Sequence, residues 1–259
     1  MKQIDLMPLV FSVLVLALAS PSGFANDAES GGHDMHHHEI SSPKDYVIMQ
    51  TWDHQKQVLL SSGMTEAEAD GKILDWLTTY QSMDRAAGKD RIGLQAPPFQ
   101  FDGWLNSEPL ALDDLKGHVV FIRWFTDTCP FCASSAPGLR QLYDEYTDQG
   151  LKMIAVFHPK AGRDDPLDKE RVARVVEARN FKFPVAIDWD WRKGTLKDWW
   201  LTGPKRPGTS VTFILDKSGV IRFVHPGMEY HEDNGSELHK MCASDMGNIK
   251  NAIESLLAE

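Results

Sequence analysis

The chain has 259 residues and a formal net charge of −10 at pH 7, from 37 acidic and 27 basic residues. This acidic balance argues against nucleic acid as a partner, because neutralising phosphates requires clustered lysine and arginine. Three cysteines are too few for a secreted disulfide scaffold, which carries more of them and in even number. The length suits one good-sized domain with an appendage.

Residues 1–25 have the pattern of a signal peptide. Lys2 supplies a positive start, residues 6–19 form an apolar core, and Gly23 and Ala25 are small residues before a cleavage point at Asn26. The core is shorter than the ~20 apolar residues of a spanning helix, which favours a cleaved signal over an uncleaved membrane anchor. We therefore expect a periplasmic or otherwise exported protein that is soluble after cleavage.

Residues 26–45 are polar and lack apolar periodicity, which predicts a disordered linker. This linker contains a histidine-rich tract, His33 and His36 to His38, of a kind that binds copper, zinc or nickel loosely. We favour a solvated tail over a metal site there.

Residues 46–90 have helix-like apolar spacing, and Thr65 with Glu68 has the pattern of a capping box. This segment predicts a helical extension without recognisable chemistry.

Residues 91–259 alternate between strand-like and helix-like segments, which predicts a single α/β domain. The run at 119–125 is apolar apart from Arg123, as in a buried parallel strand. Further strands are expected at 151–157, 183–188, 210–216 and 220–225, and helices after Cys132 and at 168–179, 194–200 and 247–259. Two strand–helix–strand crossovers followed by a hairpin predict a central mixed sheet flanked by helices.

Cys129 and Cys132 lie two residues apart, where the strand at 119–125 ends and a helix begins. A structural zinc site would need two further ligands at suitable spacing, and no second C-x-x-C or H-x-x-x-H follows. A structural disulfide remains the minor alternative to a redox pair. At this position the helix amide groups would stabilise a thiolate on Cys129, which is the form that attacks disulfides. The pattern therefore favours dithiol chemistry, with no metal and no cofactor.

The segments IGLQAPPF, WLNSEPLALDDLKGHVVFIRWFTDTCPFC and VTFILDKSGVIRFVHPG, together with Pro137, resemble the exported thioredoxin-like reductases of the TlpA and ResA type, in the redoxin (AhpC/TSA-like) superfamily. WLN and HPK especially resemble the DipZ type. The resemblance covers about residues 92–258. It implies a thioredoxin-like fold, Cys129 as the attacking thiol and Cys132 as the resolving one. It also implies protein thiols or disulfides as partners and a membrane-bound thiol electron donor.

The sequence departs from the thioredoxin pattern at the substrate-docking edge. Thioredoxins carry a cis-proline before the strand that matches VTFILD, where this chain has Ser210. A cis bond without proline costs about 3 kcal/mol, so we expect the Thr209–Ser210 bond to be trans. Thr209 and Ser210 are the predicted substrate-binding residues, and the Ser210 hydroxyl is expected near the sulfurs.

Other positions are candidates for tuning the dithiol. Arg123 replaces a buried acid of thioredoxin; it either reaches the site and favours the thiolate, or faces outward along the strand. Asp127 would oppose a thiolate, although weakly if solvated. His158 and His225 follow strand ends and are candidate proton shuttles, with surface or capping roles favoured. Cys242 is expected to be buried and inert.

Two other functions stay open. A peroxiredoxin-like peroxidase would form a sulfenic acid on one cysteine and resolve it with the other. The segment FIRWFTDTC places a threonine at Thr126 but lacks the proline usual for that chemistry. A copper carrier would use the dithiol with a histidine, because thiolates select Cu(I). Neither the direction of electron flow nor the physiological substrate follows from the sequence.

Overall fold

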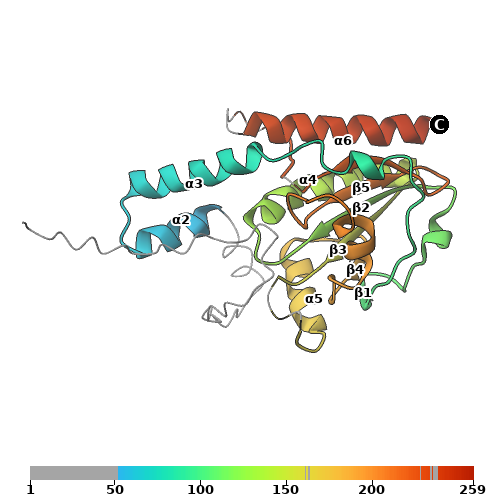
Figure 1. Cartoon of the computed structure of the whole chain (residues 1–259), viewed down its shortest axis with the longest axis horizontal. Coiled ribbons are helices and arrows are strands. Elements are labelled where there is room, and N and C mark those ends of the chain that lie inside the picture. Colours follow the sequence, from blue (N-terminus) through green and yellow to red (C-terminus); the bar gives the residue numbers. More distant parts are fainter. Residues whose placement is uncertain (1–51, 161, 163, 228, 234, 236–238) are drawn as a thin grey trace, which may run out of the picture.

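The computed structural model describes residues 52–160, 162, 164–227, 229–233, 235 and 239–259 (Figure 1). The predicted signal peptide (1–25), the histidine-rich linker (26–45) and the start of the helical extension lie outside these residues. Within the described part of the chain, no helix is long and apolar enough to cross a membrane.

A six-stranded mixed sheet forms the centre of the domain, in the order β1-β4-β3-β2-β5-β6. The strands are β1 (Gly103–Leu105), β2 (Val119–Phe125), β3 (Leu151–Phe157), β4 (Val185–Ile187), β5 (Thr212–Leu215) and β6 (Ile221–His225). β2, β3 and β4 are parallel, whereas β5 runs antiparallel to both β2 and β6. The predicted α/β class and mixed sheet are confirmed. The antiparallel edge strand β1 is additional, and its three residues are too few to show a period.

Helices cover both faces of the sheet, and β2 supplies side chains to each side. Phe121 and Phe125 lie in one core with α4 (Pro130–Tyr146), α5 (Lys169–Ala178) and α6 (Lys240–Ala258). Ile122 and Trp124 lie in the other core, with the short helix η4 (Lys197–Leu201). Every residue of β2 is buried. Because successive side chains alternate between faces, Arg123 lies on the same side of the sheet as α4.

Two predicted helices differ from those observed. The helix expected at 194–200 is mostly a five-residue π-helix, in which Trp199 and Trp200 are both buried. The last helix begins at Lys240 rather than at residue 247, because Cys242 and Met246 are buried and extend its apolar face towards its start. This earlier start brings Cys242 into the helix.

The helical extension forms a hairpin of α2 (Trp52–Ser61) and α3 (Glu66–Gln81). The capping box is present: the Glu68 carboxylate accepts the Thr65 backbone N–H at 2.8 Å, and the Glu68 N–H donates to the Thr65 hydroxyl at 3.3 Å. Both helices lie at one end of the α4 axis in Figure 1. Trp52 and Leu77 pack against Phe131, which lies between the two cysteines of the motif. The hairpin therefore lies against the start of α4.

Candidate active site

Cys129 and Cys132 lie at the junction of β2 and α4. Cys129 is the N-cap residue with extended backbone, and its carbonyl accepts the backbone N–H groups of Cys132 and Ala133, both at 3.1 Å. Pro130 occupies the first helical turn, where a missing N–H costs no hydrogen bond. Both cysteines are free thiols; Cys129 is partly exposed and Cys132 is only 2% exposed. Cys129 is thus the less buried residue of the pair.

The thiol with the lowered pKa is that of Cys132. Its hydrogen bond with Cys129 lowers this pKa most, and the charges of Arg123 and Arg179 lower it further against the opposing effect of burial. The same hydrogen bond raises the pKa of Cys129, and burial of this thiol raises it further by a smaller amount. The hydrogen bond between the sulfurs, together with the two guanidinium groups, thus favours negative charge on the inner sulfur, whereas the sequence predicted a thiolate on Cys129. As a coupled pair, the two thiols release one proton readily and hold the second.

Arg123 reaches the site and does not face outward. Its side chain is completely buried, and its Nη1 donates a hydrogen bond to the Thr212 hydroxyl at 3.2 Å. The guanidinium lies 5.0 Å from the centroid of the Tyr230 ring. A buried cation needs such partners to offset its desolvation. These contacts hold a positive charge on the face of the sheet that carries Cys132.

Ser210 contacts the inner sulfur directly. Its hydroxyl oxygen lies 3.1 Å from Cys132 Sγ. No cis peptide bond occurs in the described residues, so the Thr209–Ser210 bond is trans, as predicted. A side chain at Gly227 (φ +102°) would come within 2.9 Å of the Ser210 carbonyl oxygen. Thr209 and Ser210 are themselves largely buried. The start of β5 is therefore held between the dithiol and the glycine turn.

Asp127 is neither solvated nor uncompensated, which corrects the expectation from the sequence. It is 1% exposed, and its carboxylate accepts a hydrogen bond from Arg171 Nε at 2.7 Å. Arg171 belongs to α5, a helix more than forty residues further along the chain, so the pairing depends on how α5 packs. The guanidinium neutralises the carboxylate, and Asp127 therefore opposes the thiolate less than an isolated buried acid would.

The domain matches a known family over residues 92–224, the AhpC/TSA family. The chain belongs to this family. Among its AhpC/TSA relatives is the thiol–disulfide oxidoreductase ResA of Bacillus cereus, 31% identical over 145 residues, which are 56% of this chain and 75% of the relative. The thioredoxin-like protein YneN of Bacillus subtilis is 28% identical over 148 residues, 57% of this chain and 79% of the relative. The predicted resemblance to the ResA type is confirmed.

Solved structures with the thioredoxin-like fold also align with this AhpC/TSA domain. A protein described as the thiol:disulfide interchange protein DsbE of Chlorobium tepidum aligns over 64% of this chain and 97% of its own, at 21% identity and a TM-score of 0.49. A thiol-disulfide isomerase from Corynebacterium glutamicum covers 63% and 97%, at 22% identity and a TM-score of 0.48. The sheet order and the helices on both faces of the sheet agree with the predicted thioredoxin-like fold.

The two candidate histidines of the AhpC/TSA domain are both buried, contrary to the favoured surface or capping roles. Burial lowers the pKa of His158 to about 3, far from the range in which a proton shuttle works at neutral pH. His225 Nε2 lies 3.1 Å from Asp245 Oδ2, yet burial outweighs this carboxylate and lowers the His225 pKa as well. Both rings are therefore neutral at pH 7.

Two features of the site were missed from the sequence. The first is the cover over the motif, because Cys129 and Phe131 pack with Trp52 and Leu77 of the helical hairpin. The second is the surroundings of Cys242, which is buried as predicted but lies in a group of potential metal ligands. Both features join segments that are far apart in the chain, so no local sequence pattern predicts them.

Proposed function

We propose that this thioredoxin-like thiol–disulfide oxidoreductase is exported and exchanges disulfides with protein cysteines through Cys129 and Cys132. The observation that carries the proposal is the asymmetry of the pair: a partly exposed cysteine at the N-cap of α4, hydrogen-bonded to a buried cysteine beside two guanidinium groups. ResA of Bacillus cereus is named for the same class of reaction. Export is supported by the signal-peptide pattern of residues 1–25.

In the reductive direction, Cys129 is the attacking thiol because it is the less buried residue of the pair. The Cys132 thiolate accepts the Cys129 proton through their hydrogen bond, and Cys129 attacks the substrate disulfide. A mixed disulfide forms and one substrate thiolate leaves, taking the proton that Cys132 had accepted, so Cys132 is again a thiolate. The Cys132 thiolate then attacks Cys129 Sγ, which forms the internal disulfide and releases the second substrate sulfur as a thiolate that takes up a proton from water. Two electrons pass to the substrate, and a thiol donor, proposed to be membrane-bound, restores the dithiol. Oxidation of a substrate dithiol follows the same steps in reverse.

The remaining site residues have supporting roles in this proposal. Arg123 stabilises negative charge on Cys132, which favours both the uptake of the Cys129 proton and the resolving attack. Ser210 contributes its hydroxyl to the same sulfur, and Thr209 and Ser210 form the edge along which a substrate polypeptide would lie. Neither role requires a cofactor.

Trapping of the mixed disulfide tests the proposal. The Cys132→Ser variant retains the attacking thiol but lacks the resolving one, so covalent complexes with exported proteins should accumulate and should disappear on reduction. Cys129→Ser is the matched control and should trap none through the motif. Cys242→Ser, made in the Cys132→Ser background, should leave the complexes intact.

The same proteins distinguish the two alternatives. If the wild type consumes hydroperoxide rapidly while Cys132→Ser collects no partner proteins, the site is a peroxidase. If the reduced dithiol binds one equivalent of Cu(I) and does not reduce insulin, the domain is a copper carrier. In the structure the Thr126 hydroxyl donates to Asp127 at 3.1 Å, and this contact supplies no argument for peroxide chemistry.

A further inference from the structure

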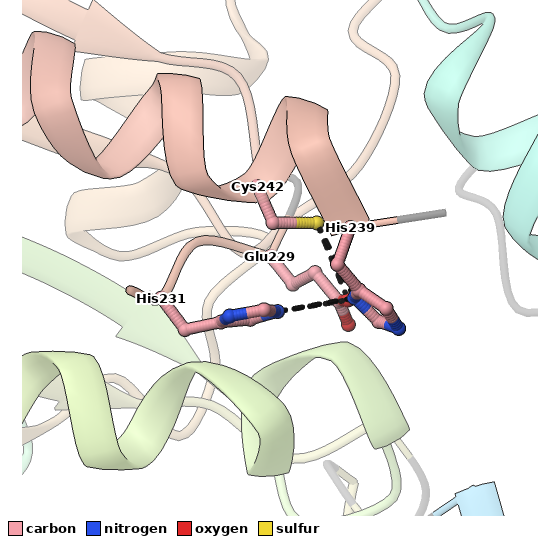
Figure 2. Close-up of side chains that lie close together, drawn as sticks. All are labelled: Glu229, His231, His239 and Cys242. Atoms are coloured by element: carbon pink, nitrogen blue, oxygen red, sulfur yellow. Dashed lines mark hydrogen bonds and ion pairs between the residues drawn. The ribbon is translucent and has the colours of Figure 1, made fainter. Parts of the chain in front are cut away.

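A second group of reactive side chains lies where the segment after β6 meets the start of α6. Glu229 and His231 come from that segment, His239 is the N-cap residue of α6, and Cys242 lies three residues further on. One potential ligand atom from each side chain lies within 4.8 Å of all the others. Figure 2 shows these side chains converging between the two segments. None of them belongs to the dithiol motif.

The separations between the donor atoms are close to those of a tetrahedral metal site. With bonds of about 2.0–2.3 Å to nitrogen, oxygen and sulfur, the edges of a tetrahedron measure about 3.3–3.8 Å. Cys242 Sγ lies 3.4 Å from Glu229 Oε1 and 3.7 Å from His239 Nδ1, and His231 Nε2 lies 3.7 Å from Glu229 Oε1. Two shorter edges, 2.8 and 3.1 Å, both involve His239 Nδ1. Small side-chain rotations would lengthen them.

Hydrogen bonds within this group leave one buried oxygen without a partner. His239 Nδ1 lies close to the Glu229 carboxylate, His231 Nε2 and Cys242 Sγ, but it can carry only one hydrogen. Glu229 is 1% exposed, and among the described residues its Oε2 has no hydrogen-bond partner. A buried carboxylate oxygen without a partner is costly unless another cation or donor binds it. A metal ion bound by Oε1, with Oε2 as a second and longer contact, would supply that partner.

The His231 ring is oriented as a metal ligand would be. Its Nδ1 lies 2.7 Å from the backbone carbonyl oxygen of Glu232. A carbonyl only accepts hydrogen bonds, so Nδ1 carries a proton, and whenever the ring is neutral the Nε2 lone pair faces the group. Metal-binding histidines commonly use this second hydrogen bond to fix the tautomer and the ring plane. This hydrogen bond from His231 Nδ1 to Glu232 involves none of the four donor atoms, so it is a separate observation that supports a metal site.

We propose that Glu229, His231, His239 and Cys242 bind one Zn²⁺. Two neutral imidazoles, one carboxylate and one thiolate offset the charge of a divalent ion, so no net charge is buried. Nitrogen and sulfur ligands with one oxygen suit zinc, and four protein ligands leave no open position. The site is therefore structural. Glu229 and His231 belong to the segment after β6, and His239 and Cys242 to the start of α6. The ion therefore links this segment to α6.

This link lies close to the redox site through Tyr230, the residue between Glu229 and His231. The Tyr230 backbone N–H donates to Ser135 Oγ at 3.2 Å on α4, and its ring packs on Arg123. Gly138 of α4 also lies against this segment, because a side chain there would approach the Tyr230 carbonyl oxygen within 3.1 Å. Bound zinc would therefore hold the segment that carries Tyr230 in place against α4.

The test uses the chain without an affinity tag, in a background that removes competing ligands: Cys129→Ser, Cys132→Ser, and asparagine at His33, His36, His37 and His38. This protein should bind one equivalent of Zn²⁺, and of Co²⁺ with the absorption bands of tetrahedral cobalt and a thiolate charge-transfer band. Cys242→Ser should remove the charge-transfer band, and His239→Asn should weaken Zn²⁺ binding more than about ten-fold. His118→Asn, outside the group, is the matched control and should leave binding unchanged.

Protection of Cys242 gives a second readout that does not require a ligand variant to fold. Under native conditions, Zn²⁺ should slow the alkylation of Cys242 in the background protein and should raise the Tm of that protein. A chelator should reverse both effects. A folded background protein that binds no stoichiometric Zn²⁺ or Co²⁺, with Cys242 alkylated equally fast in either condition, overturns the proposal. Binding of Cu(I) without Zn²⁺ also overturns it.

Discussion

The hydroxyl of Ser210 lies 3.1 Å from the sulfur of Cys132, at a position where thioredoxins have a proline with no side-chain donor. A hydrogen bond to a charged group contributes about 1.5–3 kcal/mol. Ser210→Ala should therefore raise the first pKa of the dithiol by about one to two units, as seen in the pH dependence of thiolate absorbance. Thr209→Val is the control. An unchanged titration would show that the hydroxyl does not stabilise the thiolate.

Ser210→Pro tests the shape of the docking edge. Proline removes the hydroxyl and favours a cis bond that the surrounding strand does not have, so we expect a loss of stability of about 1–3 kcal/mol. The rate of insulin reduction and the dithiol potential should both change. If neither changes, the start of β5 does not take part in substrate exchange.

Arg123→Met should raise the first pKa of the dithiol, because it removes the guanidinium that favours charge on Cys132. An opposite charge at such a site shifts a pKa by about one unit or more. The pH midpoint for alkylation of the reduced protein should move up accordingly. Arg222→Met, an exposed arginine on β6 paired with Glu259, should leave the midpoint where it is. Equal midpoints in both variants would contradict the role of Arg123.

Trp52→Ala should make Cys129 more reactive. The Trp52 and Phe131 rings meet edge to face with centroids 4.9 Å apart, a contact that contributes about 0.5–1.5 kcal/mol. Loss of this contact should loosen the hairpin over the motif and increase the iodoacetamide rate at Cys129 several-fold. Trp76→Ala, in the same hairpin but outside the Phe131 cluster, should have little effect. Similar rates in both variants would mean that the hairpin does not limit access.

Stability should fall as the pH rises towards 7, because of Asp188. Burial raises the pKa of this carboxyl to about 7, whereas in the unfolded chain it is near 4. The folded state therefore binds more protons than the unfolded state between these values, and its stability declines as the pH rises through that window. Asp188→Asn should remove a few kcal/mol of this decline.

Urea midpoints measured from pH 5 to 8 would test the role of Asp188. Asparagine can still accept the hydrogen bonds from Trp124 Nε1 and the Leu196 N–H, which Asp188 Oδ2 receives at 3.2 and 2.7 Å. The exposed Asp113→Asn is the matched control and should retain the wild-type slope. If Asp188→Asn also retains it, the carboxyl does not titrate in this range.

Local patterns in the sequence predicted the scaffold of the candidate site. The apolar run at 119–125 predicted a buried strand, and the apolar spacing beyond Cys132 predicted the helix that follows the cysteines. Both predictions rest on the periodicity of apolar side chains along a strand or helix, which depends only on residues close together in the chain. The trans Thr209–Ser210 bond was predictable for the same reason, since its cost depends on two adjacent residues.

Only the tertiary structure decided which charges and rings surround the sulfurs. Arg123 lies in a strand that is buried on both faces, so the sequence did not reveal which face α4 covers. The pairing of Asp127 with Arg171, the packing of Trp52 on Phe131 and the approach of Glu229 to Cys242 all join separate elements. Each depends on how helices pack on the sheet. Side-chain contacts between distant segments produce no periodic pattern in the sequence from which they could be predicted. The same packing places Arg123 and Arg179 where their charges lower the pKa of Cys132, because electrostatic effects depend on distance in space and not along the chain.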